Sequence, residues 1–508
     1  MLSARPSESR LPFWTWAALP LLVAAWLRFR GLGTLEPFVD EAGNILVALD
    51  SRVKTVVDPL GQGRPLLACQ FLPAGWFPAH ALLVARLLSA GAGLATVSAL
   101  GLALFRLAGR PAALCGMALW ATMPFAVFHE RLALQDTFVA ALLAWSTVCI
   151  VTGVSRPEGR RPLWFVVAGT FFGTAFLIKI SAVFALGWLG LIYSAIQRSH
   201  TRRIFGRELV LLGLGALAPL ALLGPSLFKV GQHSSRFESL PVFDSGHYWA
   251  SAAGRLATWL RWHEGYGGWP LLLLLAGALV LSLRARSRVV GACALGSVLA
   301  LLVSALFYNR PFARYALPDH LPLVFFLSLA WGRALVSTAG RTRALAAAVL
   351  LVALGRWTLV SRQIGTAPET AAIPAQEIAQ YVTGPWSGRG LNDVRRFLGD
   401  YADRHNVRCL VLTHRFLRPG CYGLMLAELG DPRIGVVPFT VYEPSELAAS
   451  LPGLKKISAG QRVAFFLLYE GSLYPAAAWL DQPGAPTRRV FTTPHGAADK
   501  FTLYQFEP

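Results

Sequence analysis

The sequence predicts a multi-pass α-helical membrane protein with about eleven transmembrane helices, followed by a C-terminal α/β domain outside the membrane. Composition gives the first reason, because 55% of the 508 residues are hydrophobic and only 15% are charged, with a mean hydropathy of +0.50. A soluble enzyme of this length rarely carries so few charges. The second reason is that apolar runs long enough to cross a bilayer recur throughout the first 361 residues.

The transmembrane helices are predicted from eleven apolar runs. These cover residues 12–29, 79–105, 111–128, 133–154, 162–177, 181–197, 208–227, 269–283, 289–307, 318–332 and 344–361. The first run is longer than the core of a signal peptide, and no cleavage site of small residues follows it. We therefore expect this run to be a retained helix.

Basic residues indicate the orientation in the membrane. They concentrate in alternate connections between the predicted helices, for example at Arg198, Arg202, Arg203 and Arg207, and are few in the short connections on the other side. By the positive-inside rule the N-terminus is cytoplasmic, and an odd number of helices makes the C-terminal domain extracytoplasmic. The formal net charge of +20 thus follows membrane topology, and we expect no nucleic-acid partner.

Residues 1–361 form the predicted transmembrane domain, which includes long outer loops at 30–78 and 228–268. The second loop ends in TWLRWHEGYGGWP. Tryptophan and tyrosine favour the boundary between lipid and water, so we expect this stretch to lie along the membrane interface.

Residues 362–508 form the predicted α/β domain. Its strand-like runs VRCLVLT, RVAFFLLY and FTLYQF follow the helix-like stretch LNDVRRFLGDYADRH. The WSGRG loop before that helix lacks the full glycine spacing of a phosphate-binding loop, and we interpret it as a turn. Cys409 and Cys421 would lie in an oxidising compartment, where a disulfide between them could form.

Ionisable residues gather in the predicted outer connections. Four outer segments contribute them: the first loop and the stretches HERLALQDTF, TAFLIKISA and FYNRPFARYALPDHLP. The residues are Asp40, Glu41, Arg131, Asp136, Lys179, Tyr308, Arg310, Arg314 and Tyr315. An acidic pair after a helix is often only a solvated loop, and a structural salt bridge is the alternative for Arg131 with Asp136. However, ionisable groups near hydrocarbon are costly and are usually paired or functional. Carboxylates and cations at one membrane face suit glycosyl transfer from a lipid phosphate, in which a base activates a hydroxyl and cations hold the departing phosphate.

The order of these features resembles the GT-C glycosyltransferases that use polyprenyl-phosphate sugars, and within them the protein O-mannosyltransferase and lipid A aminoarabinose transferase branch. A short N-terminus, one helix and a DE pair opening a long outer loop match the start of that family. GRPLLACQFLPAGW, with Arg64, resembles its basic-Pro-Pro-Leu segment, although Leu66 replaces the second proline. The spacing of Arg131 and Asp136, the stretch GTAFLIKISA and the stretch ARYALPDHLP match three further motifs. The resemblance covers about residues 10–335.

The resemblance implies hexosyl or pentosyl transfer from a polyprenyl-phosphate sugar to an acceptor hydroxyl, with inversion, on the outer side of the cell (inner) membrane. Asp40 would be the general base, with Glu41 and Asp136 shaping the site. The cations expected to bind the donor phosphate, and their supporting residues, are Arg64, Lys179, Arg310 and Arg314, with Arg131, Tyr308 and Tyr315. Whether the acceptor is a protein, a lipid or a glycan stays open.

No cofactor is expected. The predicted outer loops contain no Asp-x-Asp, so a divalent metal lacks support. Residues that offer ligands nonetheless are His129, Glu130, His233, His247 and His263.

Two other functions would also place charges in a membrane protein. A lipid-linked sugar flippase or transporter needs membrane-embedded acids and bases, but the charges here gather at one face, and the sequence shows no paired repeat halves. A membrane scaffold whose outer α/β domain is the working part would leave the polar ends of the spans unexplained. We therefore expect a glycosyltransferase.

Overall fold

The computed structural model describes residues 12–507 except 57–58, 60–65, 198–201, 222–244, 286, 308–311, 338, 414–417, 439–443, 459, 472–477 and 494–500. Its residues form two compact units. The first unit comprises Met1–Arg30, Ala90–Arg131 and Gln135–Gly365, and the second comprises Gly31–Ser89, Leu132–Leu134 and Thr366–Pro508.

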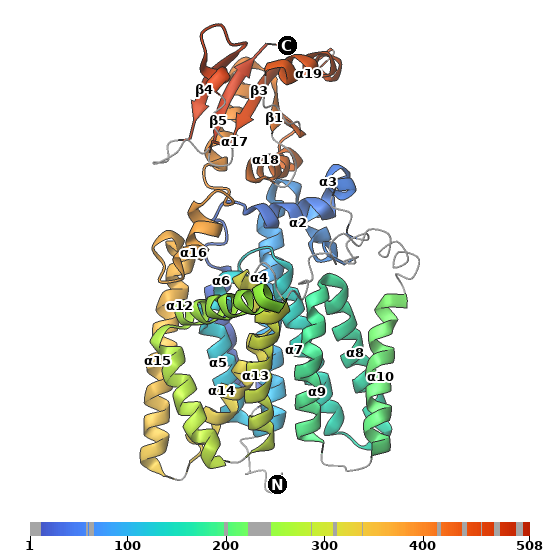
Figure 1. Ribbon diagram of the computed structural model, residues 1–508, viewed down its shortest axis with the longest axis vertical. Coiled ribbons are helices and arrows are strands. Elements are labelled where there is room, and N and C mark those ends of the chain that lie inside the picture. Colours follow the sequence, from blue (N-terminus) through green and yellow to red (C-terminus); the bar gives the residue numbers. More distant parts are fainter. Residues whose placement is uncertain are drawn as a thin grey trace. The chain divides into compact units, whose positions relative to one another are not determined.

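The first unit is helical (Figure 1). Its helices are α1 (Phe13–Phe29), α5 (Arg110–Thr122), α6 (Pro124–Glu130), α7 (Gln135–Val154), α8 (Arg161–Ile178), α9 (Ala185–Ile196), α10 (Arg202–Ala221), α12 (Ser245–Ala285), α13 (Arg288–Phe307), α14 (His320–Leu335) and α15 (Gly340–Thr366), together with most of α4 (Ala81–Ala108). Short 3-10 helices, among them η4 (Ile180–Phe184) and η6 (Ala313–Ala316), lie in the connections between these helices.

Each of the eleven predicted apolar runs overlaps helical residues. Among the described residues, six helices are long and apolar enough to cross a membrane, or seven if α5 and α6, bent by 59° at Pro124, form one span. Three other runs are shorter apolar helices, at Thr15–Phe29, Ile180–Ile196 and His320–Leu335. The remaining run, 208–227, extends beyond the described residues of α10.

The predicted outer loop at 228–268 is described from residue 245 onward, where it is helical. It forms the first half of α12, which breaks at Gly268 with φ of +59°, a backbone angle that glycine adopts without steric cost. In Figure 1 this half lies across the ends of neighbouring helices of the first unit. Trp259, Trp262 and Tyr266 are buried, whereas Leu260 is half exposed, so most of the aromatic residues of this stretch pack inward.

Helices α8 and α10 pack closely through glycine. A Cβ at Gly169 would lie 2.0 Å from the carbonyl oxygen of Leu212, and one at Gly173 would lie 2.4 Å from that of Ala216. Small residues four apart allow such close approach of two membrane helices. This packing fixes the end of α8, where Lys179 follows.

The second unit combines a sheet with helices. Its elements are α2 (Val39–Leu49), α3 (Ser51–Val56), η1 (Cys69–Trp76), η2 (Pro78–His80), α16 (Ala375–Glu377), α17 (Leu391–His405), β1 (Arg408–Thr413), α18 (Pro419–Gly430), β2 (Ile434–Pro438), α19 (Pro444–Ile457), β3 (Val463–Tyr469), β4 (Thr487–Thr492) and β5 (Thr502–Phe506). The strand order is β2-β1-β3-β5-β4. Strand β1 is parallel to β2 and β3, while β5 is antiparallel to β3 and β4.

Alternating residues of the strands pack on opposite faces of this sheet. Leu410 and Phe465 share a core with Leu447 of α19, whereas the ring of Phe466 packs against Phe397 of α17. This alternation is the expected period of two. Helix α17 and strands β1, β3 and β5 lie where the sequence predicts a helix and three strands.

The predicted disulfide between Cys409 and Cys421 is wrong, because both thiols are buried and free. The Cys409 thiol contacts the carbonyl oxygen of Leu398 in α17. The Cys421 sulfur, in α18, lies 3.8 Å from the sulfur of Met425. The two thiols are thus packed into separate local contacts.

Candidate functional site

Glu41 is the central buried group of the acidic loop, residues 32–41, in the second unit. Its side chain is 0% exposed and pairs with Arg86, which is 1% exposed. Arg86 Nε donates to Glu41 Oε1 at 2.8 Å and Arg86 Nη2 donates to Oε2 at 2.7 Å. This bidentate geometry is the strong form of an arginine–carboxylate pair.

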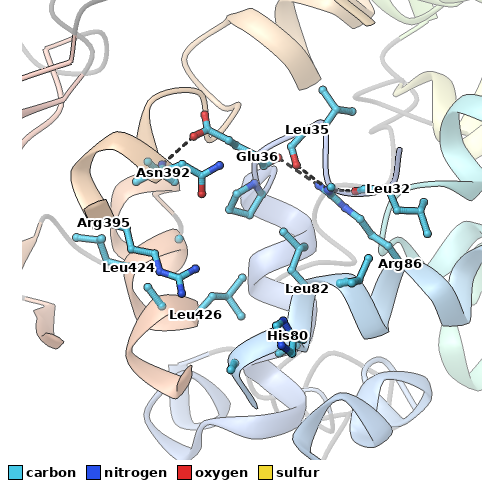
Figure 2. Close-up of a pocket in the computed structure, with 18 of the residues that line it drawn as sticks. Leu32, Leu35, Glu36, His80, Leu82, Arg86, Asn392, Arg395, Leu424 and Leu426 are labelled. Carbon is cyan, nitrogen blue, oxygen red and sulfur yellow. Dashed lines mark hydrogen bonds between the residues drawn. The ribbon is translucent and has the colours of Figure 1, made fainter. Parts of the chain in front are cut away.

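Arg86 also holds the backbone that precedes the acidic pair. It donates to the carbonyl oxygens of Leu32 at 2.7 Å, Leu35 at 2.6 Å and Glu36 at 3.2 Å. Figure 2 shows the guanidinium reaching Leu32 and Leu35 from α4. One side chain in α4 therefore fixes the conformation of residues 32–41.

Two backbone N–H groups complete the environment of Glu41. Oε2 accepts from Phe38 at 3.1 Å, which closes the N-terminus of α2, and Oε1 accepts from Ala133 at 2.7 Å. Asn44 donates to the carbonyl oxygen of Ala133 at 3.2 Å. Glu41 thus organises α2 and the short segment Leu132–Leu134.

Asp40 has a different environment from its neighbour. It is half-buried, in the first turn of α2, where the helix dipole favours a carboxylate. Successive residues of a helix point about 100° apart, so Asp40 and Glu41 lie on different faces of α2. Of the two carboxylates, Asp40 is the one with solvent-accessible surface.

In the first unit, four predicted residues come together from three segments. Asp136 lies in the first turn of α7, Lys179 follows the end of α8, and Arg314 and Tyr315 lie in η6. The Lys179 ammonium binds Asp136 Oδ1, and Arg314 Nε lies 3.9 Å from Oδ2. Lys179 Nζ also lies 3.6 Å from the centroid of the Tyr315 ring, within the range of a cation–π contact.

This cluster is nearly closed to solvent. The side chains of Lys179 and Arg314 are each 8% exposed, and that of Asp136 is 5% exposed. Two cations sharing one carboxylate at a helix end form a suitable place for a phosphate, whose oxygens bind several donors at once. The main chain places Lys179 here because its φ of −153° and ψ of 121° end α8.

Arg131 binds main-chain groups at the end of α1. It donates to the carbonyl oxygens of Leu27 at 3.0 Å and Arg28 at 3.3 Å, and to that of Arg30. These carbonyls close a helix C-terminus, where cations are favoured. The salt bridge considered between Arg131 and Asp136 is replaced by this capping role and by the pairing of Asp136 with Lys179.

Three predicted cation or tyrosine positions, Arg64, Tyr308 and Arg310, lie outside the described residues. Sequence reasoning missed the importance of Arg86 and of the pair formed by Arg28 and Glu130. The side chains of Arg28 and Glu130 are fully buried, and Arg28 Nε donates to Glu130 Oε2. The available signal was a charged residue inside an apolar run, since Arg86 interrupts the run at 79–105.

Metal ligation gains no support from the described residues, among which no group of three His, Cys, Asp or Glu side chains lies close enough to hold an ion. Glu130 binds Arg28 and the Trp120 indole N–H. His263 shares a hydrogen bond with the carbonyl oxygen of Trp259 and stacks on His320. His233 and the side chain of His247 lie outside the described part of the chain.

Part of the chain matches a known family. Residues 79–227 match the family described as dolichyl-phosphate-mannose-protein mannosyltransferase. No curated protein matches the chain at a significant level.

The fold is similar to that of a solved structure. ArnT from Cupriavidus metallidurans, bound to undecaprenyl phosphate, has a TM-score of 0.59 and 15% sequence identity, with 97% of each chain covered. The apo state of the same protein has a TM-score of 0.57 and 14% identity, again over 97% of each chain. The predicted resemblance to the GT-C glycosyltransferases is confirmed as a resemblance of fold, and it extends beyond residue 335 through nearly the whole chain.

Proposed function

We propose that the protein is a membrane glycosyltransferase that moves a sugar from a polyprenyl-phosphate donor to an acceptor hydroxyl on the extracytoplasmic side of the inner membrane. The observation that carries this proposal is the gathering of Asp136, Lys179, Arg314 and Tyr315 from three separate segments. The match to a mannosyltransferase family and the undecaprenyl phosphate bound by ArnT support the same donor chemistry. The acceptor is a protein, lipid or glycan, and the transferred group is a hexosyl or pentosyl unit.

Asp40 acts as the general base. Its carboxylate takes the proton of the acceptor hydroxyl while the oxygen forms a bond to the anomeric carbon. The bond from that carbon to the phosphate oxygen breaks with its electron pair, so the configuration inverts and polyprenyl phosphate leaves. Glu41 is unsuited to this role because Arg86, Phe38 and Ala133 already occupy its oxygens, and it acts as a positioning residue.

Lys179 and Arg314 stabilise the negative charge that develops on the departing phosphate. Asp136 holds these cations in place before the donor binds, and Tyr315 supports Lys179 through its ring. Arg64 and Arg310 remain further candidates for binding the phosphate, with Arg131 and Tyr308 as supporting residues. Preorganised donors of this kind are commonly the largest contribution to catalysis.

The test is sugar transfer by purified, lipid-reconstituted protein offered a panel of labelled polyprenyl-phosphate sugars. Asp40→Asn should lower turnover by ~10²- to 10⁴-fold, the usual contribution of a general base. Asp50→Asn is the matched control, because Asp50 lies at the opposite end of α2 and pairs with Arg52. Wild-type turnover in the Asp40 variant would exclude Asp40 as the base.

The same experiment separates transfer from transport. Release of polyprenyl phosphate from one donor, lost in the Asp40 variant, supports a transferase and identifies the sugar. If no donor is consumed but labelled lipid crosses the bilayer equally in wild-type and variant protein, the chain is a flippase and the proposal fails.

A further inference from the structure

The WSGRG loop, residues Trp386–Gly390, contacts the segment that leads into the acidic pair. Val39 N–H, at the first position of α2, donates to the carbonyl oxygen of Trp386 at 3.3 Å. The ring of Phe38 packs on Tyr381, with ring centroids 4.5 Å apart. The loop is the turn that the sequence predicts, since Leu391 N–H donates to the carbonyl oxygen of Gly388 at 2.9 Å. The loop also contacts the residues that begin α2.

Glu36 makes the strongest of these contacts. Its carboxylate accepts from the backbone N–H of Gly390 and, at 2.7 Å, from that of Asn392. These N–H groups are at the start of α17, where unpaired donors and the helix dipole favour an anion. Figure 2 shows Glu36 directed to Asn392 on one side of the segment and Arg86 bound to Leu32 and Leu35 on the other.

Two glycines make the close approach sterically feasible. A Cβ at Gly388 would lie 2.4 Å from the carbonyl oxygen of Pro37, so any side chain there would displace the acidic segment. Gly390 has φ of +98°, which L residues rarely adopt. The glycines of the loop therefore serve contact with residues 36–39.

We propose that Glu36 and the WSGRG loop are positioning elements that hold the Asp40 carboxylate in the orientation required for proton abstraction. This inference rests on the proposed function. Asp40 is four residues from Glu36 and follows Val39, so its backbone is fixed by the loop on one side and by Arg86, through Glu41, on the other. The C-terminal residues thereby contribute to catalysis without touching the sugar.

A purely stabilising contact predicts a different outcome. Glu36 also accepts hydrogen bonds at the N-terminus of α17, so replacing Glu36 should lower the stability of the protein whether or not Glu36 positions Asp40. A positioning role adds a specific requirement, because removing Glu36 should slow the chemical step only while Asp40 is present to be positioned.

The experiment compares initial transfer rates of reconstituted wild type, Glu36→Ala, Glu36→Gln, Asp40→Asn and the double variant Glu36→Ala/Asp40→Asn. We expect Glu36→Ala to lower kcat by up to ~10²-fold, as for a displaced catalytic group, with the donor KM unchanged. Glu36→Gln, which keeps an acceptor oxygen for one of the N–H groups, should recover part of that loss. The double variant should be no slower than Asp40→Asn alone.

Two matched controls report on α17 itself. Asp393→Asn removes another carboxylate from the first turn of α17, but that carboxylate pairs with Arg396 in the same helix. Gly399→Ala adds a methyl group that meets only Arg433 at an ordinary 3.8 Å, whereas Gly388→Ala collides with Pro37. We expect wild-type kcat in the two controls and a kcat reduced as in Glu36→Ala for Gly388→Ala.

The outcomes separate the two proposals. If Asp40→Asn keeps wild-type transfer, the base assignment fails. If Asp40→Asn is impaired but Glu36→Ala has wild-type kcat, or the double variant loses the product of both single effects, the positioning role is wrong.

Discussion

Replacing Arg86 tests whether the buried pair with Glu41 organises the acidic loop. Arg86→Met keeps most of the side-chain volume but leaves Glu41, which is 0% exposed, without its counter-charge. It also removes the donors to the carbonyl oxygens of Leu32 and Leu35. Breaking a buried ion pair from one side costs about 3–5 kcal/mol, because an uncompensated charge stays buried.

The second unit has about 200 residues, and for a unit of that size 1 kcal/mol shifts the unfolding midpoint by about 2–4 °C. We therefore expect the midpoint of Arg86→Met to fall by about 6–20 °C in lipid nanodiscs, measured by tryptophan fluorescence during heating. Glu41→Gln in the same chain removes the buried charge. The double variant Arg86→Met/Glu41→Gln should thus be more stable than Arg86→Met alone.

Two results would refute this reasoning. A fall of less than about 2 °C for Arg86→Met would show that the buried pair adds little net stability. The two charged groups would then be about as favourable in water, in the unfolded chain, as in their buried pair. A double variant no more stable than Arg86→Met would show that the buried charge is not the source of the loss.

Three further experiments test the Lys179 cluster, the buried thiols and the break in α12. Lys179→Ala should lower transfer by ~10²-fold at saturating donor, because it removes a cation that we propose stabilises the departing phosphate, and unchanged rates would exclude this role of Lys179. Burial raises the pKa of Cys409 and of Cys421 to about 12, and since an acid with a raised pKa stays neutral until the pH approaches it, only ~10⁻⁴ of each thiol is thiolate at pH 8. Maleimide should therefore label these thiols only after unfolding, and rapid labelling of the folded protein would contradict their burial. Gly268→Ala should cost about 1–3 kcal/mol, since it forces a positive φ on alanine, and an unchanged unfolding midpoint would show that the break in α12 relaxes.

Hydropathy and motif spacing predicted the local features well. The apolar runs coincide with helices, and the strands β1, β3 and β5 lie within a residue of their predicted bounds. For the site, spacing selected Asp136, Lys179, Arg314 and Tyr315, and the structure brings them together. Charges in otherwise apolar surroundings are rare, which is why the sequence singled out these residues, and their catalytic roles stay predictions.

Partners far apart in the sequence were beyond such reasoning. Glu36 looked like any loop acid, because the groups that donate to it are backbone N–H groups of Gly390 and Asn392, which carry no side-chain signature. Arg131 was matched to Asp136 by spacing alone, whereas its donors are directed to carbonyls at the end of α1. Main-chain partners of this kind are common for side-chain hydrogen bonds, and a sequence does not reveal them.

The separation of Glu36 from its partners has a consequence for the order of biosynthesis. Gly390 is translated 354 residues after Glu36, which at ~5–20 residues per second takes about 20–70 s. During this interval residues 32–41 have already been made, but the WSGRG loop, which we propose positions Asp40, does not yet exist. Under the proposed function, a nascent chain gains transfer activity only after its C-terminal residues have been made and folded, so an unfinished chain does not consume the lipid-linked donor.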